Sequence, residues 1–164
     1  MKIRKATGKD VDGIYELFLE MIKSEDAASR KSGISLMTLR KKDKNFEKNA
    51  RKELLREIRA KNSLYLVAED KGKLTAYAYG FVPKNDDPFF SKSIVGYFSA
   101  ILVTKKYRRK GLAKKLKVEM ENWFKKKKCD FIYLEVFAEN PASKLYKKWG
   151  YKVTTQKMFK KVKK

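Results

Sequence analysis

The stretch from Ile94 to Phe137 constrains the fold of this chain more than any other part of its sequence. Two apolar runs typical of buried strands enclose a segment whose apolar residues recur at helical spacing, namely Leu112, Leu116, Met120 and Trp123. We place the two strands at Ile94–Val103 and Phe131–Phe137. Strands joined by a helix of this length lie parallel, because the chain must cross over between them. The sequence therefore predicts a mixed sheet with helices on both faces.

The N-terminal half adds strands and helices to this unit. Residues 2–6 are typical of a short opening strand, and Thr7 followed by Asp10 resembles a capping box that begins a helix. Apolar positions at helical spacing predict that this first helix reaches Ile22 and that a second one runs from Phe46 to Ile58. The polar stretch Ser24–Arg40 between them is interpreted as a mobile connection.

The remaining segments complete an α/β fold in the order β-α-α-β-β-β-α-β-α-β. Leu64–Glu69 and Leu74–Val82 are expected to form a hairpin across the turn Asp70–Lys73. Asn85–Pro88 then interrupts the pattern. Pro141–Trp149 is predicted as a short helix that ends at Gly150, and Tyr151–Val162 as a closing strand.

Length and composition limit the classes of protein that this chain can belong to. Its 164 residues suit one domain, expected to cover residues 1–164, and no apolar run approaches the length of a membrane span. The start Met-Lys-Ile-Arg-Lys lacks the apolar block of a secretory signal, so we expect a cytoplasmic protein. With one cysteine, Cys129, and no histidine, the chain excludes an internal disulfide and Ser-His or Cys-His catalysis, and we expect no metal.

The charge of the chain is strongly positive. Forty-two Lys and Arg against 19 Asp and Glu give a formal net charge of +23. Such a charge attracts polyanions over long distances, and nucleic acid or ribosomes are conceivable weak partners. The lysines are spread over most surface segments, however, which is also typical of a solvated basic surface without a dedicated site.

The segment from Val103 to Ala113 carries the most specific chemical signal. A strand end feeds a basic loop, Arg108-Arg109-Lys110-Gly111, that opens a helix at Leu112. Unpaired N–H groups at a helix N-terminus and nearby cations form a cradle for a pyrophosphate, and a glycine lets the phosphate approach the backbone. Taken alone, the pattern RxxGxA also fits an ordinary basic turn before a helix.

At this point the chain resembles the GNAT acetyltransferase family, whose signature Q/RxxGxG/A follows the fourth strand and binds the pyrophosphate of acetyl-CoA. A second motif supports the resemblance, since Leu134-Glu135-Val136 is followed by Asn140, Ala142, Leu145-Tyr146 and Gly150-Tyr151. The order of elements agrees along the whole chain. Within the family, the motifs are most similar to those of ribosomal-protein alanine N-acetyltransferases.

The resemblance implies a role for each matching residue. It implies backbone contacts from the end of the fourth strand to pantetheine, and a pyrophosphate held by the loop and the start of the helix. The cofactor-binding residues implied are Leu102, Val103, Arg108, Arg109, Lys110, Gly111, Leu112, Ala113, Asn140 and Tyr146. Tyr146 would also be the general acid and Glu135 the general base. Asn140 lies six residues before Tyr146, where the family commonly has seven.

Alternatives from the residues themselves remain open. Tyr146 also fits a core tyrosine packed beside Trp149, and strand alternation allows Glu135 to be the ion-pair partner of a lysine. Carboxylates beyond the first helix are remote candidates for the base, namely Glu20, Glu25 and Asp26.

These observations predict an acetyl-CoA-dependent N-acetyltransferase that transfers the acetyl group directly to a primary amine in a ternary complex. The amine belongs to a protein N-terminus, a lysine or a small molecule, and the resemblance implies that about residues 24–42 and 83–93 select it. The positive surface disfavours a free polyamine unless carboxylates form a local acidic pocket, for which the candidates are Glu20, Glu25, Asp26, Asp86 and Asp87. We expect no membrane partner and a monomer or homodimer. The alternative is a basic nucleic-acid- or ribosome-binding protein on an inactive acyltransferase fold.

Overall fold

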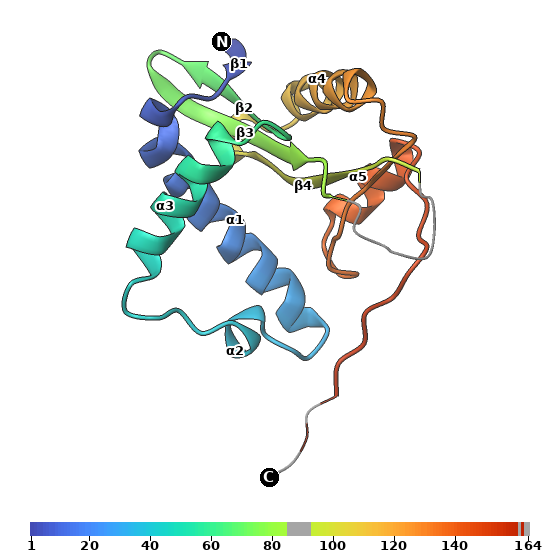
Figure 1. The fold of residues 1–164 in the computed structure, drawn as a ribbon. Coiled ribbons are helices and arrows are strands. Elements are labelled where there is room, and N and C mark those ends of the chain that lie inside the picture. Colours follow the sequence, from blue (N-terminus) through green and yellow to red (C-terminus); the bar gives the residue numbers. More distant parts are fainter. Residues whose placement is uncertain (85–92, 161, 163–164) are drawn as a thin grey trace. The chain divides into compact units, whose positions relative to one another are not determined.

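The structure is a computed structural model that describes residues 1–84, 93–160 and 162 (Figure 1). The chain divides into two compact units. The first comprises Met1–Met21 and Asp43–Glu135, and the second comprises Ile22–Lys42 and Val136–Lys164. We describe each unit by itself.

The first unit contains the sheet. Its five strands lie in the order of the sequence: β1 (Lys2–Lys5), β2 (Ser63–Asp70), β3 (Lys73–Phe81), β4 (Val95–Val103) and β5 (Phe131–Tyr133). Neighbouring strands are antiparallel from β1 to β4, and β5 is parallel to β4. The parallel pair confirms the crossover, and hence the mixed sheet, that the sequence predicts.

Seven helical segments are assigned in the described residues. They are the 3₁₀ turns η1 (Gly8–Asp10) and η2 (Lys105–Tyr107) and the helices α1 (Val11–Lys31), α2 (Leu36–Leu39), α3 (Phe46–Arg59), α4 (Leu112–Lys126) and α5 (Ala142–Lys148). α3 agrees with the second helix, expected from Phe46 to Ile58, and α4 begins at Leu112 as expected. α5 also agrees and ends before Gly150, as expected.

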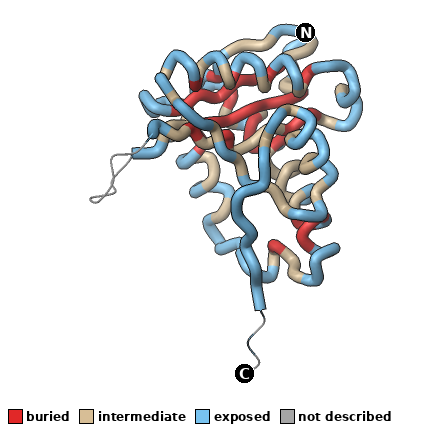
Figure 2. The backbone as a smooth tube through the Cα atoms, turned by 90° about the vertical axis from the view of Figure 1, so that its right-hand side faces the viewer, coloured by how far each residue is buried: buried red, intermediate tan, exposed pale blue. Residues whose placement is uncertain are grey.

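Two apolar cores cover the two faces of the sheet. On one face α1 and α3 pack against aromatic residues of β2 and β3, such as Tyr65 and Tyr77. On the other face, α4 packs on small residues of the same strands, such as Ala76 and Ala78 (Figure 1). α4 approaches β4 so closely that a Cβ on Gly96 would overlap the ring of Phe124. Figure 2 shows that the buried stretches of the chain follow the central strands.

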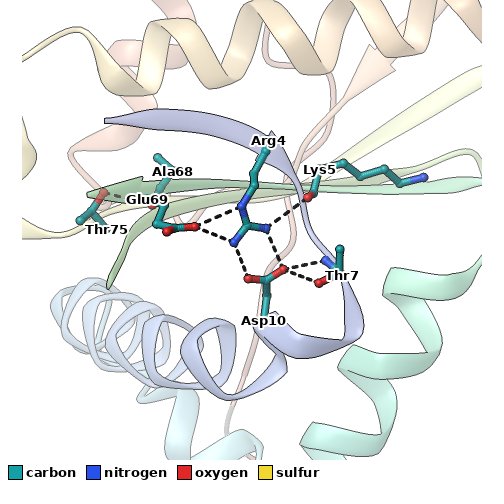
Figure 3. Close-up of polar contacts among 7 residues, drawn as sticks. All are labelled: Arg4, Lys5, Thr7, Asp10, Ala68, Glu69 and Thr75. Atoms are coloured by element: carbon teal, nitrogen blue, oxygen red, sulfur yellow. Dashed lines mark hydrogen bonds and ion pairs between the residues drawn. The ribbon is translucent and has the colours of Figure 1, made fainter. Parts of the chain in front are cut away.

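A charged cluster joins β1, β2 and the start of the first helical segment (Figure 3). The Arg4 guanidinium donates to both oxygens of Asp10, at 2.9 and 2.7 Å, and to Oε2 of Glu69 at 2.7 Å. Asp10 also accepts the backbone N–H of Thr7 at 2.7 Å, which confirms the predicted capping box. The cluster ties the opening strand to the sheet.

The expectation of a mobile connection at Ser24–Arg40 is wrong. α1 continues to Lys31, and α2 follows within the same stretch. The segment is held by buried polar groups that a hydrophobic pattern does not reveal. Asp26 accepts hydrogen bonds from the hydroxyl of Ser35 at 2.7 Å and the N–H of Met37 at 3.1 Å, and Ser29 accepts the N–H of Leu36 at 2.8 Å.

The C-terminal strands also differ from expectation. The predicted buried strand Phe131–Phe137 is reduced to the three residues of β5, and Phe131 is 65% exposed. The predicted closing strand is absent from the described part, since residues 151–160 and 162 adopt no strand. A strand requires a partner for its backbone groups, and an apolar pattern does not supply one. Val153 and Met158 accordingly remain exposed.

Candidate functional site

Strands β4 and β5 pair over three residues and then part. Their last paired residues are Tyr97 and Tyr133, whereas β4 continues to Val103. Among the described residues, no strand pairs with the rest of β4 on that side. The sheet therefore has a local opening along the C-terminal half of β4, with backbone groups directed into it.

The hydrogen bonds of β4 show which of its groups face the opening. The Thr104 N–H donates to the carbonyl of Thr75 at 3.0 Å, on the β3 side. Because polar groups alternate along an antiparallel strand, Leu102 also faces β3 and Val103 faces the opening. The side chain of Leu102 is buried in the core beneath α1 and α3. Of the two strand residues expected to contact a cofactor, Val103 alone has its backbone groups directed into the opening.

The basic loop that follows β4 is held in place at two points. Arg108 donates from Nε to the carbonyl of Val103 at 2.8 Å, and its Nη2 lies 3.5 Å from Glu20. The hydroxyl of Tyr107 donates to Asp70, in the β2–β3 turn, at 2.7 Å. These contacts fix the path of the loop, and the sequence analysis did not predict them.

The loop ends at a helix N-terminus that faces solvent. Gly111 is the N-cap of α4 with φ of 76°, in the left-handed region that glycine adopts without strain. A Cβ at this position would have no neighbour within 4 Å, so space is open above it. The residues before it, Arg108 to Lys110, are exposed, whereas Leu112 is buried and anchors the helix. The first N–H groups of α4 therefore point out of the protein next to three cations.

Glu135 lies in the first unit just beyond the end of β5. It is exposed and belongs to the segment that leaves the sheet, not to a strand as expected. Burial, and to a lesser extent the charge of Glu135, raises the pKa of Tyr133, which precedes Glu135 by two residues. The expected base thus lies beside the point at which β4 and β5 part.

Tyr146 lies in the second unit, on α5. Gly150, with φ of 91°, ends this helix, and the Tyr151 N–H donates back to the Tyr146 carbonyl at 3.1 Å. The Tyr146 ring packs edge-on against Trp149 and Tyr151, with centroid distances of 5.8 and 6.1 Å. Burial, and to a lesser extent the charge of Glu25, raises its pKa to about 12. The aromatic packing predicted as the alternative is therefore present.

Asn140 stabilises the start of α5 in the second unit. Its side-chain oxygen accepts the N–H of Ala142 at 2.9 Å, at the start of α5. Asn residues before a helix commonly satisfy free backbone donors in this way. The structure thus brings together the loop residues Arg108–Ala113 and Val103, while Asn140 caps the helix that carries Tyr146.

Part of the expected acceptor region is outside the described residues. Asp86, Asp87 and most of residues 83–93 belong to it, so the structure does not bear on them. Of the remote acidic candidates, Asp26 is engaged in the hydrogen bonds described above. Glu20 lies beside Arg108, and Glu25 is partly buried, which raises its pKa.

The opening of a mixed sheet beside a glycine-led helix N-terminus is an arrangement that suits an acyl-CoA. A model of the acetyltransferase (GNAT) family matches residues 33–151. The chain belongs to this family, and it is an acetyl-CoA-dependent N-acetyltransferase. No curated protein matches the sequence significantly.

Solved structures share the fold at low sequence identity. A mutant of the BH1408 protein from Bacillus halodurans is 19% identical with a TM-score of 0.79, over 99% of both chains. Aminoglycoside N-acetyltransferase AAC(6')-Iy in complex with CoA is 17% identical with a TM-score of 0.68, over 99% of both chains. The apo form of aminoglycoside 6'-N-acetyltransferase AAC(6')-IG from Acinetobacter haemolyticus is 19% identical with a TM-score of 0.66, also over 99% of both.

The residues of the site fit the acetyl-CoA that the family uses. A pantetheine arm carries amide groups, and the outward N–H of Val103 can pair with them, whereas the Val103 carbonyl already accepts a hydrogen bond from Arg108. The α4 N-terminus and its cations suit a pyrophosphate. In the described part of the chain, no group of three or more Cys, Asp or Glu side chains is placed to hold a metal ion. Within the same part, no helix has the length and apolar character needed to cross a membrane.

Proposed function

We propose that this enzyme acetylates a primary amine of a protein or peptide, at an N-terminus or a lysine, by direct transfer in a ternary complex. The observation that carries the proposal is the opening of the sheet along β4, which ends at the exposed N-terminus of α4. We also propose that residues 1–164 act as one acetyltransferase domain.

In this proposal the loop and β4 bind the donor, which supplies an acetyl group activated as a thioester. The N–H groups at Leu112 and Ala113 receive the pyrophosphate, together with Arg109 and Lys110. Arg108 already donates a hydrogen bond to the Val103 carbonyl, so its main role is to hold the loop against the end of β4. The N–H of Val103 holds the pantetheine arm in the opening.

Two side chains move protons. Glu135 takes the proton from the acceptor ammonium, because an amine with a pKa near 8 to 10 is mostly protonated at neutral pH and cannot attack. Tyr146 holds a proton at its hydroxyl for the departing thiolate. With its pKa raised to about 12, Tyr146 keeps this proton over the whole neutral range. The aromatic packing of Tyr146 is compatible with this role, because it orients the hydroxyl.

The high positive charge of the chain favours an acceptor with few positive charges. A net charge of +23 repels a free polycation, unless local carboxylates compensate for it. A single amine on a protein or peptide meets less repulsion. The aminoglycosides named for the similar structures are the competing acceptor class, and panels of peptides and of aminoglycosides will separate the two.

The binding half of the proposal is tested by calorimetry with two donors. The double variant R109A/K110A should bind acetyl-CoA about tenfold more weakly than the unmodified chain, because two charge-assisted contacts to phosphate are lost. Its affinity for S-acetylpantetheine, which has no pyrophosphate, should be unchanged. Equal weakening for both ligands, or no binding of acetyl-CoA to the unmodified chain, contradicts the proposed site. Salt-steep RNA binding without donor binding would instead favour the nucleic-acid alternative.

A further inference from the structure

A continuous row of aromatic rings crosses the sheet of the first unit. Starting in the core, Tyr65 stacks on Tyr79 at 4.1 Å between centroids, and Tyr79 contacts Phe81 at 5.7 Å. Phe81 meets Tyr97 edge-on at 5.3 Å, and Tyr97 stacks on Tyr133 at 4.5 Å with 9° between the planes. The row therefore passes from β2 to β5 without interruption.

The inner end of the row is rigid. Tyr65 and Tyr79 are buried, and the Tyr65 hydroxyl donates to Glu57 at 2.7 Å. Rings held at one end by a core and a hydrogen bond present a fixed surface at the other end. The outer pair, Tyr97 and Tyr133, thus has little freedom left to lose when a ligand binds.

The outer end of the row lies at the opening of the sheet. Tyr97 and Tyr133 are the last pair before β4 and β5 part. Among the described residues β5 is the last strand of the sheet, so the Tyr133 ring stacks on Tyr97 on its β4 side and has no neighbouring strand on its other side. Tyr133 is 42% exposed. The Tyr133 ring is therefore accessible at the end of the β4–β5 ladder.

The chemistry of this surface suits a cation on an aliphatic stem. Ring faces attract ammonium groups, and they also pack against methylene groups. Glu135 follows two residues after Tyr133 and adds a negative charge at this place in a strongly basic chain. A polyanion is not favoured here, because the carboxylate and the electron-rich ring faces repel it.

We propose that the Tyr97–Tyr133 ring pair binds the ammonium group of the acceptor and its aliphatic stem, and that Tyr133 thereby determines acceptor specificity. The ammonium lies against the exposed part of the Tyr133 ring where β4 and β5 part, and Glu135, two residues further along the chain, takes its proton. This inference rests on the proposed function and specifies its acceptor: a primary amine on an unbranched aliphatic stem, as in a lysine side chain.

Two probes of equal shape test the proposal without knowledge of the natural acceptor. Choline carries a cation, and 3,3-dimethylbutan-1-ol is its neutral carbon analogue. Binding of each to the full chain saturated with coenzyme A is followed by NMR of ring-labelled tyrosine. We expect choline to bind about fivefold more tightly, as an exposed cation–π contact permits. Equal affinities of the two probes would overturn the proposal.

Variants of β5 separate the ring from the charge of Glu135. Tyr133→Phe keeps the aromatic ring and should retain the preference for choline. Tyr133→Leu removes the ring and should abolish the preference. The matched control is Phe131→Leu, on the same strand and more exposed, which should leave the preference intact. A preference that survives in Tyr133→Leu would show that the ring does not contribute.

A further measurement keeps this inference distinct from the proposed function. For acetylation of Nα-acetyl-lysine amide, Tyr133→Leu should raise the KM of the amine about fivefold and leave the KM of acetyl-CoA unchanged. If the chain binds acetyl-CoA but both KM values stay at wild-type levels in this variant, the ring-pair proposal fails alone. If acetyl-CoA does not bind, the proposed function fails, whatever the choline result.

Discussion

The Nε atom of Arg108 donates a hydrogen bond to the main-chain carbonyl of Val103 at 2.8 Å. Arg108 belongs to the loop before α4, and Val103 is the last residue of β4. The bond therefore connects the strand edge and the loop before the helix N-terminus, the two parts of the proposed donor site. It also occupies a carbonyl that would otherwise face the opening of the sheet.

Removing this connection should weaken donor binding. In Arg108→Met the loop loses its attachment to Val103, and we expect the affinity for acetyl-CoA, measured by calorimetry, to fall about fivefold. Lys106→Met removes an equal charge from the same loop without this bond and serves as the control. Equal losses in the two variants would mean that only the charge matters.

The hydroxyl of Tyr146 should affect turnover and not donor binding. Tyr146→Phe is expected to lower kcat about a hundredfold, because the leaving thiolate loses its proton donor, with little change in the KM of acetyl-CoA. Tyr151→Phe removes a hydroxyl from a ring packed against Tyr146 and is the control. An unchanged kcat in Tyr146→Phe would exclude this residue as the acid.

A second prediction concerns the ionisation of Tyr146. The charge of Glu25 contributes to the raised pKa of this tyrosine, after burial. Glu25→Gln removes a negative charge that disfavours the phenolate, so the pKa of Tyr146 should fall below its value of about 12. NMR titration of ring-labelled tyrosine, with Tyr146→Phe to assign the signal, measures the change. A pKa that rises or stays constant would contradict this effect of the Glu25 charge.

The role of Glu135 is visible in the pH dependence of the rate. In Glu135→Gln the amine must lose its proton to water, so kcat/KM should fall about a hundredfold at neutral pH and the acidic limb should move to higher pH. Glu139→Gln, at an exposed site in the second unit, should leave the profile unchanged. A wild-type profile in the first variant would remove Glu135 from the mechanism.

The cluster around Arg4 predicts how stability responds to acid. Hydrogen bonds from Arg4 lower the pKa of Asp10 from 3.8 to about 2, although burial opposes the shift. A lowered pKa stabilises the fold above the ordinary value and ceases to do so as the pH falls toward 2. Asp10→Asn should therefore cost about 2 kcal/mol of unfolding free energy at pH 7 and progressively less below pH 4.

Urea unfolding at several pH values measures this difference. Glu16→Gln, at an exposed position of α1, is the matched control and should change stability little at any pH. A cost in Asp10→Asn that is independent of pH would assign the effect to packing instead of charge.

Much of the sheet and the helices was predictable because their signals are local. The spacing of Leu112, Leu116 and Met120 determines a buried face of α4, and Asp70–Lys73 is a turn from its residue types alone. The basic loop and Gly111 were also recognisable, since the glycine lies directly before the apolar positions of α4. These features depend on neighbours within a few residues.

The errors have a common cause, which is dependence on distant partners. The apolar residues of 131–137 and 151–162 look like strands, but pairing depends on which edge is within reach. The bond from Arg108 to Val103 requires the path of the loop, and nothing in the sequence distinguishes Arg108 from Arg109 in this respect. The strand Leu74–Val82 was predicted, whereas the stack of Tyr97 on Tyr133 requires the register of β4 and β5.

The short pairing of β4 with β5 sets stability against activity. A longer β5 would form hydrogen bonds with backbone groups of β4 that have no strand partner now. It would then occupy the space of the proposed donor site. Selection for a more stable sheet would therefore tend to block the proposed donor site. With the donor in the proposed site, the ligand takes the position of a missing strand, and the three-residue ladder is a compromise in which the fold forgoes hydrogen bonds of its own.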